Sequence, residues 1–108
     1  MSLMFEVLAY DRRRIRLTEV QWLHMIFFHP EVEFEQAKIR EVLENPEVVV
    51  KGATPNTRIC YRFYESTPVA SKYLAVVVKV LDREGFIITG YFPERVRRGK
   101  FLWRRAKL

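Results

Sequence analysis

The sequence predicts an α+β domain: an N-terminal β-hairpin, two helices on one face of a sheet, and an antiparallel meander that forms that sheet. Residues 18–44 carry helical apolar spacing and helix-end signals, whereas residues 47–103 carry short β-branched or alternating runs between turn residues. With 108 residues, 49% of them hydrophobic, the chain has room for one core. We therefore expect a single domain over residues 1–108, in which 1–3 are a cloning remnant and 95–108 form a basic tail.

The first expected elements are the hairpin and a buried helix. Residues 5–10 and 14–17 alternate on either side of a charged turn, which is typical of a short β-hairpin. Thr18 and Gln21 have the spacing of a capping box, in which each side chain satisfies a free backbone N–H at a helix start. Residues 20–28 are apolar on most sides, so we expect this helix to be largely buried. We expect the helix to end at His29-Pro30, because the residue before a proline disfavours helical backbone angles.

The second helix and the strands follow in order. Apolar residues near helical spacing over 33–44, with glutamates at several other positions, predict a helix that ends at Asn45-Pro46. Beyond it, apolar and alternating runs predict the strands of the sheet. The expected strands cover residues 47–51, 58–64, 73–81 and 86–92, with a last short strand or turn around 101–103.

The turn before the strand at 86–92 predicts a register. Arg83-Glu84-Gly85 fits a three-residue hairpin loop that ends in a glycine at positive φ. This loop would place Lys79 opposite Thr89 and Val77 opposite Tyr91, so that the lysine, the threonine and the tyrosine share one face. An ammonium group and two hydroxyls gathered there could bind a phosphate. Alternatively, Lys79 lies at the sheet edge with its amine in solvent, and the other two are simply good strand formers.

Charge is distributed unevenly along the chain, whose formal net charge is +6. Arginines gather in residues 12–16, acids dominate residues 31–47, and no acid follows Glu94. A basic side of this kind attracts phosphate backbones, and arginine can bind phosphate through two parallel hydrogen bonds. The residues of the basic tail that we expect to hold nucleic acid are Arg95, Arg97, Arg98, Lys100 and Arg104. The alternative is a solvated basic surface without a partner.

Composition also excludes several classes of protein. A single cysteine, Cys60, rules out an internal disulfide, and with two histidines it supplies too few ligands for a structural zinc site. No apolar run reaches the roughly 18 residues of a membrane span. No basic residue precedes an apolar stretch at the N-terminus, as it would in a signal peptide. We expect a cytoplasmic protein that uses no metal, no cofactor and no membrane partner.

Two histidines are the candidates for proton transfer. Only His24 and His29 can titrate near neutral pH, which suits a general acid and a general base. Five residues of helix correspond to roughly 140° of rotation, but both rings could border one cleft because His29 has left the predicted helix. Alternatively, each is a structural histidine.

These features stand in an order that resembles the small phage- and mobile-element-associated nuclease domains of the barnase–EndoU–colicin–RelE-like (BECR) superfamily. The resemblance covers roughly residues 18–103. It rests on Trp22-Leu23-His24-Met25, His29-Pro30-Glu31, Glu41-Val42-Leu43, Asn45-Pro46-Glu47, Tyr61-Arg62, Val76-Val77-Val78-Lys79-Val80, Gly85-Phe86-Ile87-Ile88-Thr89-Gly90-Tyr91-Phe92, Arg98-Gly99-Lys100 and Leu102-Trp103.

The resemblance implies two helices packed on a four-stranded antiparallel sheet, and a metal-independent ribonuclease, often a toxin. The EndoU branch uses two histidines, a lysine, a serine or threonine, and a tyrosine two residues later. His24, His29, Lys79, Thr89 and Tyr91 occur here in that order, although the two histidines are closer together than in that branch. In the barnase and RelE branches an arginine binds the phosphate, a role that Arg62 could fill.

The resulting hypothesis is an endoribonuclease that cleaves RNA through attack by the ribose 2′-hydroxyl, and that could be the toxin of a toxin–antitoxin or phage-related system. Lys79, with Arg62 or Thr89, would stabilise charge on the phosphoryl oxygens, and Tyr91 could stack on a base. Two alternatives stay open. One is a non-catalytic RNA-binding module on the same fold, and the other is an interaction protein that forms a homodimer or binds an antitoxin.

Overall fold

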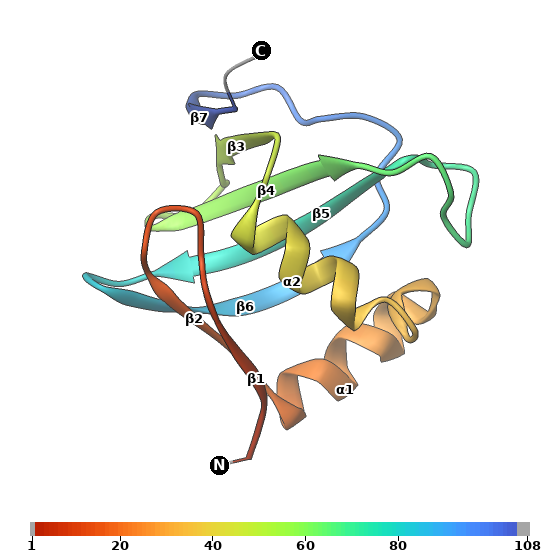
Figure 1. Ribbon diagram of the computed structural model, residues 1–108, viewed down its shortest axis with the longest axis horizontal. Coiled ribbons are helices and arrows are strands. Elements are labelled where there is room, and N and C mark those ends of the chain that lie inside the picture. Colours follow the sequence, from red (N-terminus) through yellow and green to blue (C-terminus); the bar gives the residue numbers. More distant parts are fainter. Residues whose placement is uncertain (1, 106–108) are drawn as a thin grey trace.

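The computed structural model describes residues 2–105 and contains one mixed seven-stranded sheet, in the order β1-β2-β6-β5-β4-β3-β7 (Figure 1). Two α-helices and one short 3-10 helix, η1, complete the domain. The elements in chain order are β1 (Leu3–Leu8), β2 (Arg14–Thr18), α1 (Glu19–Phe28), η1 (Pro30–Val32), α2 (Gln36–Glu44), β3 (Val48–Lys51), β4 (Thr57–Phe63), β5 (Tyr73–Val80), β6 (Glu84–Tyr91) and β7 (Phe101–Arg104).

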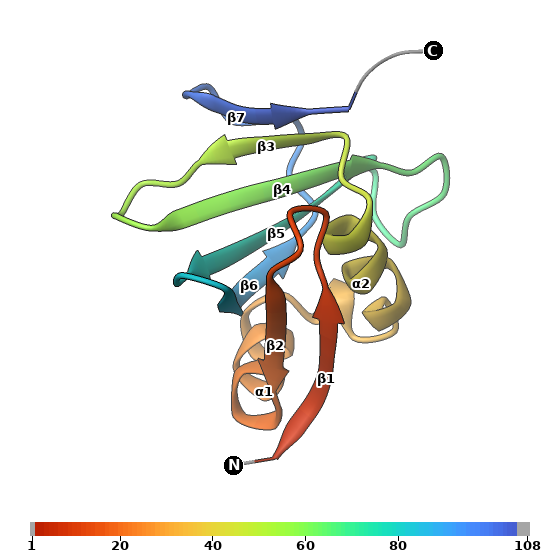
Figure 2. The same cartoon turned by 60° about the vertical axis from the view of Figure 1, so that its left-hand side comes forward.

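The α+β class is confirmed, but the four-stranded antiparallel sheet is wrong. Strands β3, β4, β5 and β6 do form the expected antiparallel meander. The N-terminal hairpin extends it, because β2 pairs in parallel with the start of β6, from Arg14 opposite Glu84 to Arg16 opposite Phe86. At the other edge β7 pairs with β3 (Figure 2). Both additions join segments that are far apart in the chain, so local sequence patterns gave no sign of them.

The predicted elements otherwise lie close to their expected positions. Leu3 pairs with Thr18 in the hairpin, so the third residue of the expected cloning remnant belongs to the sheet, while residue 1 lies outside the described residues. The predicted tail also contributes structure, since it supplies β7. Residues 92–100, which include the first part of that tail, connect β6 to β7 at the far edge of the sheet (Figure 2).

The two faces of the sheet are covered differently. On one face Cys60, Val76 and Val78 belong to the main core, which the helices and the hairpin complete. On the other face Tyr61 and its neighbours form a smaller cluster, against which Val96 of the connection packs. The backbone N–H of Arg97 donates to the Tyr61 hydroxyl at 3.1 Å. We call residues 92–100 the crossing segment, because they run over this second face.

Helix α1 is not largely buried, which corrects the expectation from its composition. Only Trp22 and Met25 are buried in it. The helix lies beside β6 rather than beneath the sheet, and the Gln21 amide donates to the backbone carbonyl of Ile88 on that strand. One side of this mostly apolar helix therefore meets the core and the other faces solvent. The N-cap is confirmed, since Thr18 accepts from the Gln21 backbone N–H at 3.2 Å.

The register predicted from Gly85 is wrong. Thr89 lies opposite Val77 rather than Lys79, and the β5–β6 ladder shifts between Val77 and Val78 because β6 carries an extra residue. The turn is also tighter than expected, with the Leu81 N–H donating to the Glu84 carbonyl at 2.7 Å. Thr89 and Tyr91 still share a face, but Lys79 lies opposite Phe86.

Candidate active site at the free edge of β6

A groove opens where β2 stops pairing with β6. The parallel pairing ends at Phe86, and beyond that residue α1 runs beside β6 (Figure 1). The groove between them has a volume of about 300 Å³. Its lining residues are His24 and Phe28 of α1, His29 just after the helix, and Ile88 and Thr89 on β6. The structure thus brings together both predicted histidines and the predicted threonine.

His29 is held in a defined position at the end of α1. Its backbone N–H donates to the Met25 carbonyl at 2.7 Å, and its φ and ψ of −134° and 70° take it out of the helix. Its ring stacks on Tyr91, with ring centroids 5.4 Å apart and planes inclined by 27°. On its other side Nδ1 lies 3.6 Å from the Glu31 carboxylate. A carboxylate beside one imidazole nitrogen can orient the ring and leave the second nitrogen for chemistry.

Glu31 is a site residue that the sequence analysis did not assign. It is the second residue of η1. The only signal in the sequence was its closeness to His29, two residues earlier in His29-Pro30-Glu31. Ile88 was missed as well, since its position in the groove follows from the bulge in β6.

His24 lies on the exposed side of α1, with its ring 4.8 Å from the ring of Phe28. The two histidines border one groove because His29 has left the helix, as the sequence suggested. Within residues 2–105 no three histidine, cysteine, aspartate or glutamate side chains are grouped as a metal site requires.

Lys79 is not part of the groove. It lies opposite Phe86, near the start of β6, whereas Thr89 lies farther along that strand. Its amine donates to the backbone carbonyl of Pro55, in the loop between β3 and β4, at 3.1 Å. The five residues assigned from the EndoU pattern therefore separate into a group of four and one lysine outside the groove.

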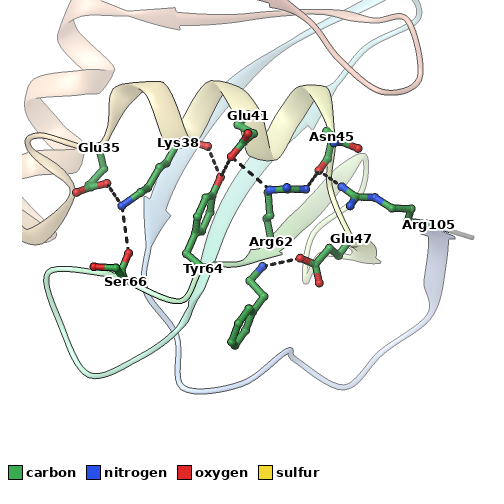
Figure 3. Close-up of polar contacts among 10 residues, drawn as sticks. Glu35, Lys38, Glu41, Asn45, Glu47, Arg62, Tyr64, Ser66 and Arg105 are labelled. Atoms are coloured by element: carbon green, nitrogen blue, oxygen red, sulfur yellow. Dashed lines mark hydrogen bonds and ion pairs between the residues drawn. The ribbon is translucent and has the colours of Figure 1, made fainter. Parts of the chain in front are cut away.

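Arg62 lies on the opposite face of the sheet from Thr89 and Tyr91. Its Nε is 3.3 Å from the Glu41 carboxylate, and its Nη1 donates to the Asn45 carbonyl at 2.8 Å, as Figure 3 shows. Its guanidinium also sits over the Tyr64 ring, 5.8 Å from the centroid. Arg62 thus joins β4 to the end of α2, and it is not placed to bind a phosphate in the groove.

The basic residues of the crossing segment follow the groove residues of β6 in the chain and lead from there across the sheet toward β3. The segment begins directly after Tyr91 and runs over the face of the sheet that carries Thr89 and Tyr91. Its exposed basic side chains are Arg95, Arg97, Arg98 and Lys100. Arg104 is farther away, on β7, where its guanidinium sits over the Phe101 ring at 4.7 Å. The end of the predicted basic tail, residues 106–108, lies outside the described residues.

Comparisons with known proteins add no relative. No protein-family model matches the chain, and neither a curated protein nor a solved structure shows significant similarity to it. The resemblance to the BECR superfamily therefore stays a prediction. Within residues 2–105 no helix is both long enough and apolar enough to cross a membrane.

Proposed function

We propose that this protein is a metal-independent endoribonuclease that cleaves RNA by transesterification. The observation that carries the proposal is the convergence of His24, His29 and Thr89 on one open groove, with Tyr91 stacked on His29 just before the basic crossing segment begins. Two imidazoles can supply both proton transfers of the reaction near neutral pH. Thr89 and Tyr91 bring hydroxyls that can donate hydrogen bonds to phosphoryl oxygens.

The reaction balances with the two histidines alone. One histidine takes the proton of a ribose 2′-hydroxyl, whose oxygen then attacks the adjacent phosphorus. The bond to the 5′-oxygen breaks, and the other histidine donates a proton to that leaving oxygen. The products are a 2′,3′-cyclic phosphate and a 5′-hydroxyl. Glu31 acts as a positioning residue, because its carboxylate lies beside Nδ1 of His29.

The crossing segment would hold the flanking backbone. Its four exposed cations follow directly after Tyr91, so a strand whose scissile phosphate lies in the groove can continue along them. Each phosphate that they neutralise releases counterions, which makes binding dependent on salt. The requirement for a 2′-hydroxyl nucleophile selects RNA over DNA. The proposed setting is the cytoplasm, in which such an enzyme could serve as the toxin of a toxin–antitoxin or phage-related pair.

A second candidate function is RNA binding without cleavage. The observation that favours it is the position of Lys79, whose amine is bonded to Pro55 outside the groove. No lysine or arginine is among the described residues that line the groove. A nuclease usually gains much of its rate from a fixed cation or donor at the phosphoryl oxygens. A module that only binds RNA needs the basic surface and not that cation.

The test is cleavage of a labelled mixed-sequence RNA in EDTA. Wild-type protein should produce fragments with 2′,3′-cyclic phosphate ends, and the double variant His24→Ala/His29→Ala should produce none. The same RNA with 2′-O-methyl riboses should resist the wild type, because it lacks the nucleophile. Binding of the unmodified RNA without cleavage would support the second candidate and overturn the first.

A further inference from the structure

The exposed side of α1 is an apolar surface that nothing within residues 2–105 covers. Val20, Leu23, Phe27 and Phe28 are exposed by 69%, 58%, 78% and 60%. At 100° of rotation per residue these four side chains share one side of the helix, opposite the buried Trp22 and Met25. His24 lies among them. We call this set of five side chains the α1 face.

The exposed apolar area of the α1 face is larger than that of single apolar residues scattered over a surface. An aromatic side chain has about 200 Å² of surface and an aliphatic one somewhat less. Scaled by their exposed fractions, the four apolar side chains together expose on the order of 500 Å². Contiguous apolar patches above a few hundred Å² usually mark an interaction site. A standard protein interface covers about 800 Å² on each partner and has an apolar centre with a polar rim. The α1 face has the size of such a centre.

We propose that the α1 face is the interface of a homodimer. Residues 20–28 contain no lysine, arginine, aspartate or glutamate. A partner selected by charge would engage the basic crossing segment or the acidic stretch around α2, and would leave this uncharged face without a match. A second copy supplies an identical uncharged apolar face, which is the self-complementarity that a two-fold interface requires.

The sequence of α1 also fits an antiparallel pair of helices. His24 is midway between Val20 and Phe28 in the chain, so a two-fold axis near His24 places Val20 of each copy toward Phe28 of the other. The small side chain then meets the large one, and the whole face is buried. The antiparallel arrangement also sets each helix N-terminus toward the C-terminus of the other helix, which is favourable for the two helix dipoles.

This dimer has a consequence for the groove, which rests on the proposed nuclease function. His24 and Phe28 belong both to the α1 face and to the lining of the groove. A second copy packed on the α1 face covers His24 and closes the groove to RNA. Cleavage per chain therefore falls as the protein concentration rises through the dimer dissociation constant.

Sedimentation equilibrium from about 1 to about 100 μM tests the interface directly. We expect wild-type protein to shift from monomer to dimer over this range, and Leu23→Glu to raise the dissociation constant by at least about tenfold. Leu81→Glu is the matched control, because Leu81 is a similarly exposed leucine, at 47%, in the β5–β6 turn. A wild type that stays monomeric, or a dimer that Leu23→Glu leaves unchanged, overturns the proposal.

Two further readouts test the geometry and the occlusion. His24→Cys should form a disulfide-linked dimer on oxidation, whereas Glu44→Cys on the exposed side of α2 should not; the native Cys60 is buried. Equal cross-linking of both variants overturns the antiparallel pairing. Cleavage per chain should fall with concentration for the wild type and stay constant for Leu23→Glu. If dimers form and nothing cleaves RNA, the nuclease proposal fails and the dimer stands.

Discussion

The ring of His29 stacks on the ring of Tyr91, 5.4 Å away between centroids. This contact joins the end of α1 to the end of β6, two elements that the sequence connected only through a family resemblance. The Glu31 carboxylate lies 3.6 Å from Nδ1, so the imidazole has a neighbour on two sides. A general acid or base held in this way needs little reorganisation when a substrate binds.

Removal of the Tyr91 ring should therefore slow RNA cleavage, because His29 loses the ring on which it stacks. We expect Tyr91→Ala to lower the single-turnover rate by roughly tenfold, since aromatic pairs contribute about 0.5–1.5 kcal/mol. Tyr91→Phe keeps the ring and should retain most of the rate unless the hydroxyl binds the phosphate. The pH–rate profile, measured under single-turnover conditions, reports on the histidine itself. An unchanged rate and profile in Tyr91→Ala would show that the stack has no positioning role.

The crossing segment should account for most of the salt dependence of RNA binding. Arg95→Gln/Arg98→Gln should weaken binding and reduce the slope of log K against log salt, by about 0.7 for each phosphate of single-stranded RNA that the variant no longer neutralises. Arg62→Gln is the control, because that guanidinium is bonded to Glu41 and Asn45 on the other face. Filter binding at several salt concentrations measures both slopes. Equal reductions in the two variants would contradict the assigned division between the faces.

Local sequence signals predicted the elements of this fold well. Thr18 caps α1 as its spacing indicated, and the strands begin and end near the predicted residues. The sheet was underpredicted, because the parallel pairing of β2 with β6 joins residues about 70 positions apart and leaves no local pattern. The burial of α1 was overpredicted for a related reason. Apolar residues on all sides of a helix do not reveal which side its neighbours will cover.

Most residues of the candidate site could be predicted from the sequence, but their arrangement in space could not. His24, His29, Thr89 and Tyr91 lie together, although the register used to group the last two was wrong. The error lay in the turn, which is tighter than predicted and moves the partner of Lys79 from Thr89 to Phe86. Arg62 was misplaced because alternation along β4 does not say which face the helices cover.

The buried thiol of Cys60 should make stability fall at alkaline pH. Burial, and then the nearby Asp11 charge, raise the pKa of Cys60 from 9.0 to about 12. Between these values the unfolded thiol loses its proton while the folded one keeps it, so the unfolded state gains stability as pH rises. The contribution of Cys60 is therefore complete below pH 9 and is lost toward pH 12.

Urea unfolding of the wild type and of Cys60→Ala at about pH 7 and about pH 10 tests this. Cys60→Ala should be less stable at neutral pH, by about 1 kcal/mol for the removal of a small apolar group from the core. It should lose less stability than the wild type on going to alkaline pH. Tyr61 and Tyr64, whose pKa values are also raised by burial, act on both proteins equally, whereas the raised pKa of Tyr10 depends mainly on burial and then on Cys60. Equal decreases in the two proteins would show that Cys60 does not carry the effect.

Gly85 is required by close packing and not by a turn. It does not adopt a positive φ, and it lies within β6 between β2 and β5. A Cβ at this position would lie 2.5 Å from the Lys79 carbonyl oxygen and 3.0 Å from Ile15 Cδ1. The Ile15 side chain could move, but the Lys79 backbone could not without breaking the β5–β6 pairing. The glycine thus permits the close approach of β6 to β5 at the residues where β6 also pairs with β2 of the N-terminal hairpin.

Gly85→Ala should therefore lower the free energy of unfolding by about 1–3 kcal/mol, the usual range for overpacking. Gly90→Ala is the matched control on the same strand, since its Cβ would meet only Met25 Sδ at 3.4 Å and the Ala75 carbonyl oxygen at 3.5 Å as its nearest neighbours. Chemical denaturation gives both stabilities. Hydrogen exchange should also show faster exchange of β2 amides in Gly85→Ala alone, because the added methyl group separates β6 from its neighbours. Similar stabilities and exchange rates in the two variants would show that the close packing at Gly85 is not required for stability.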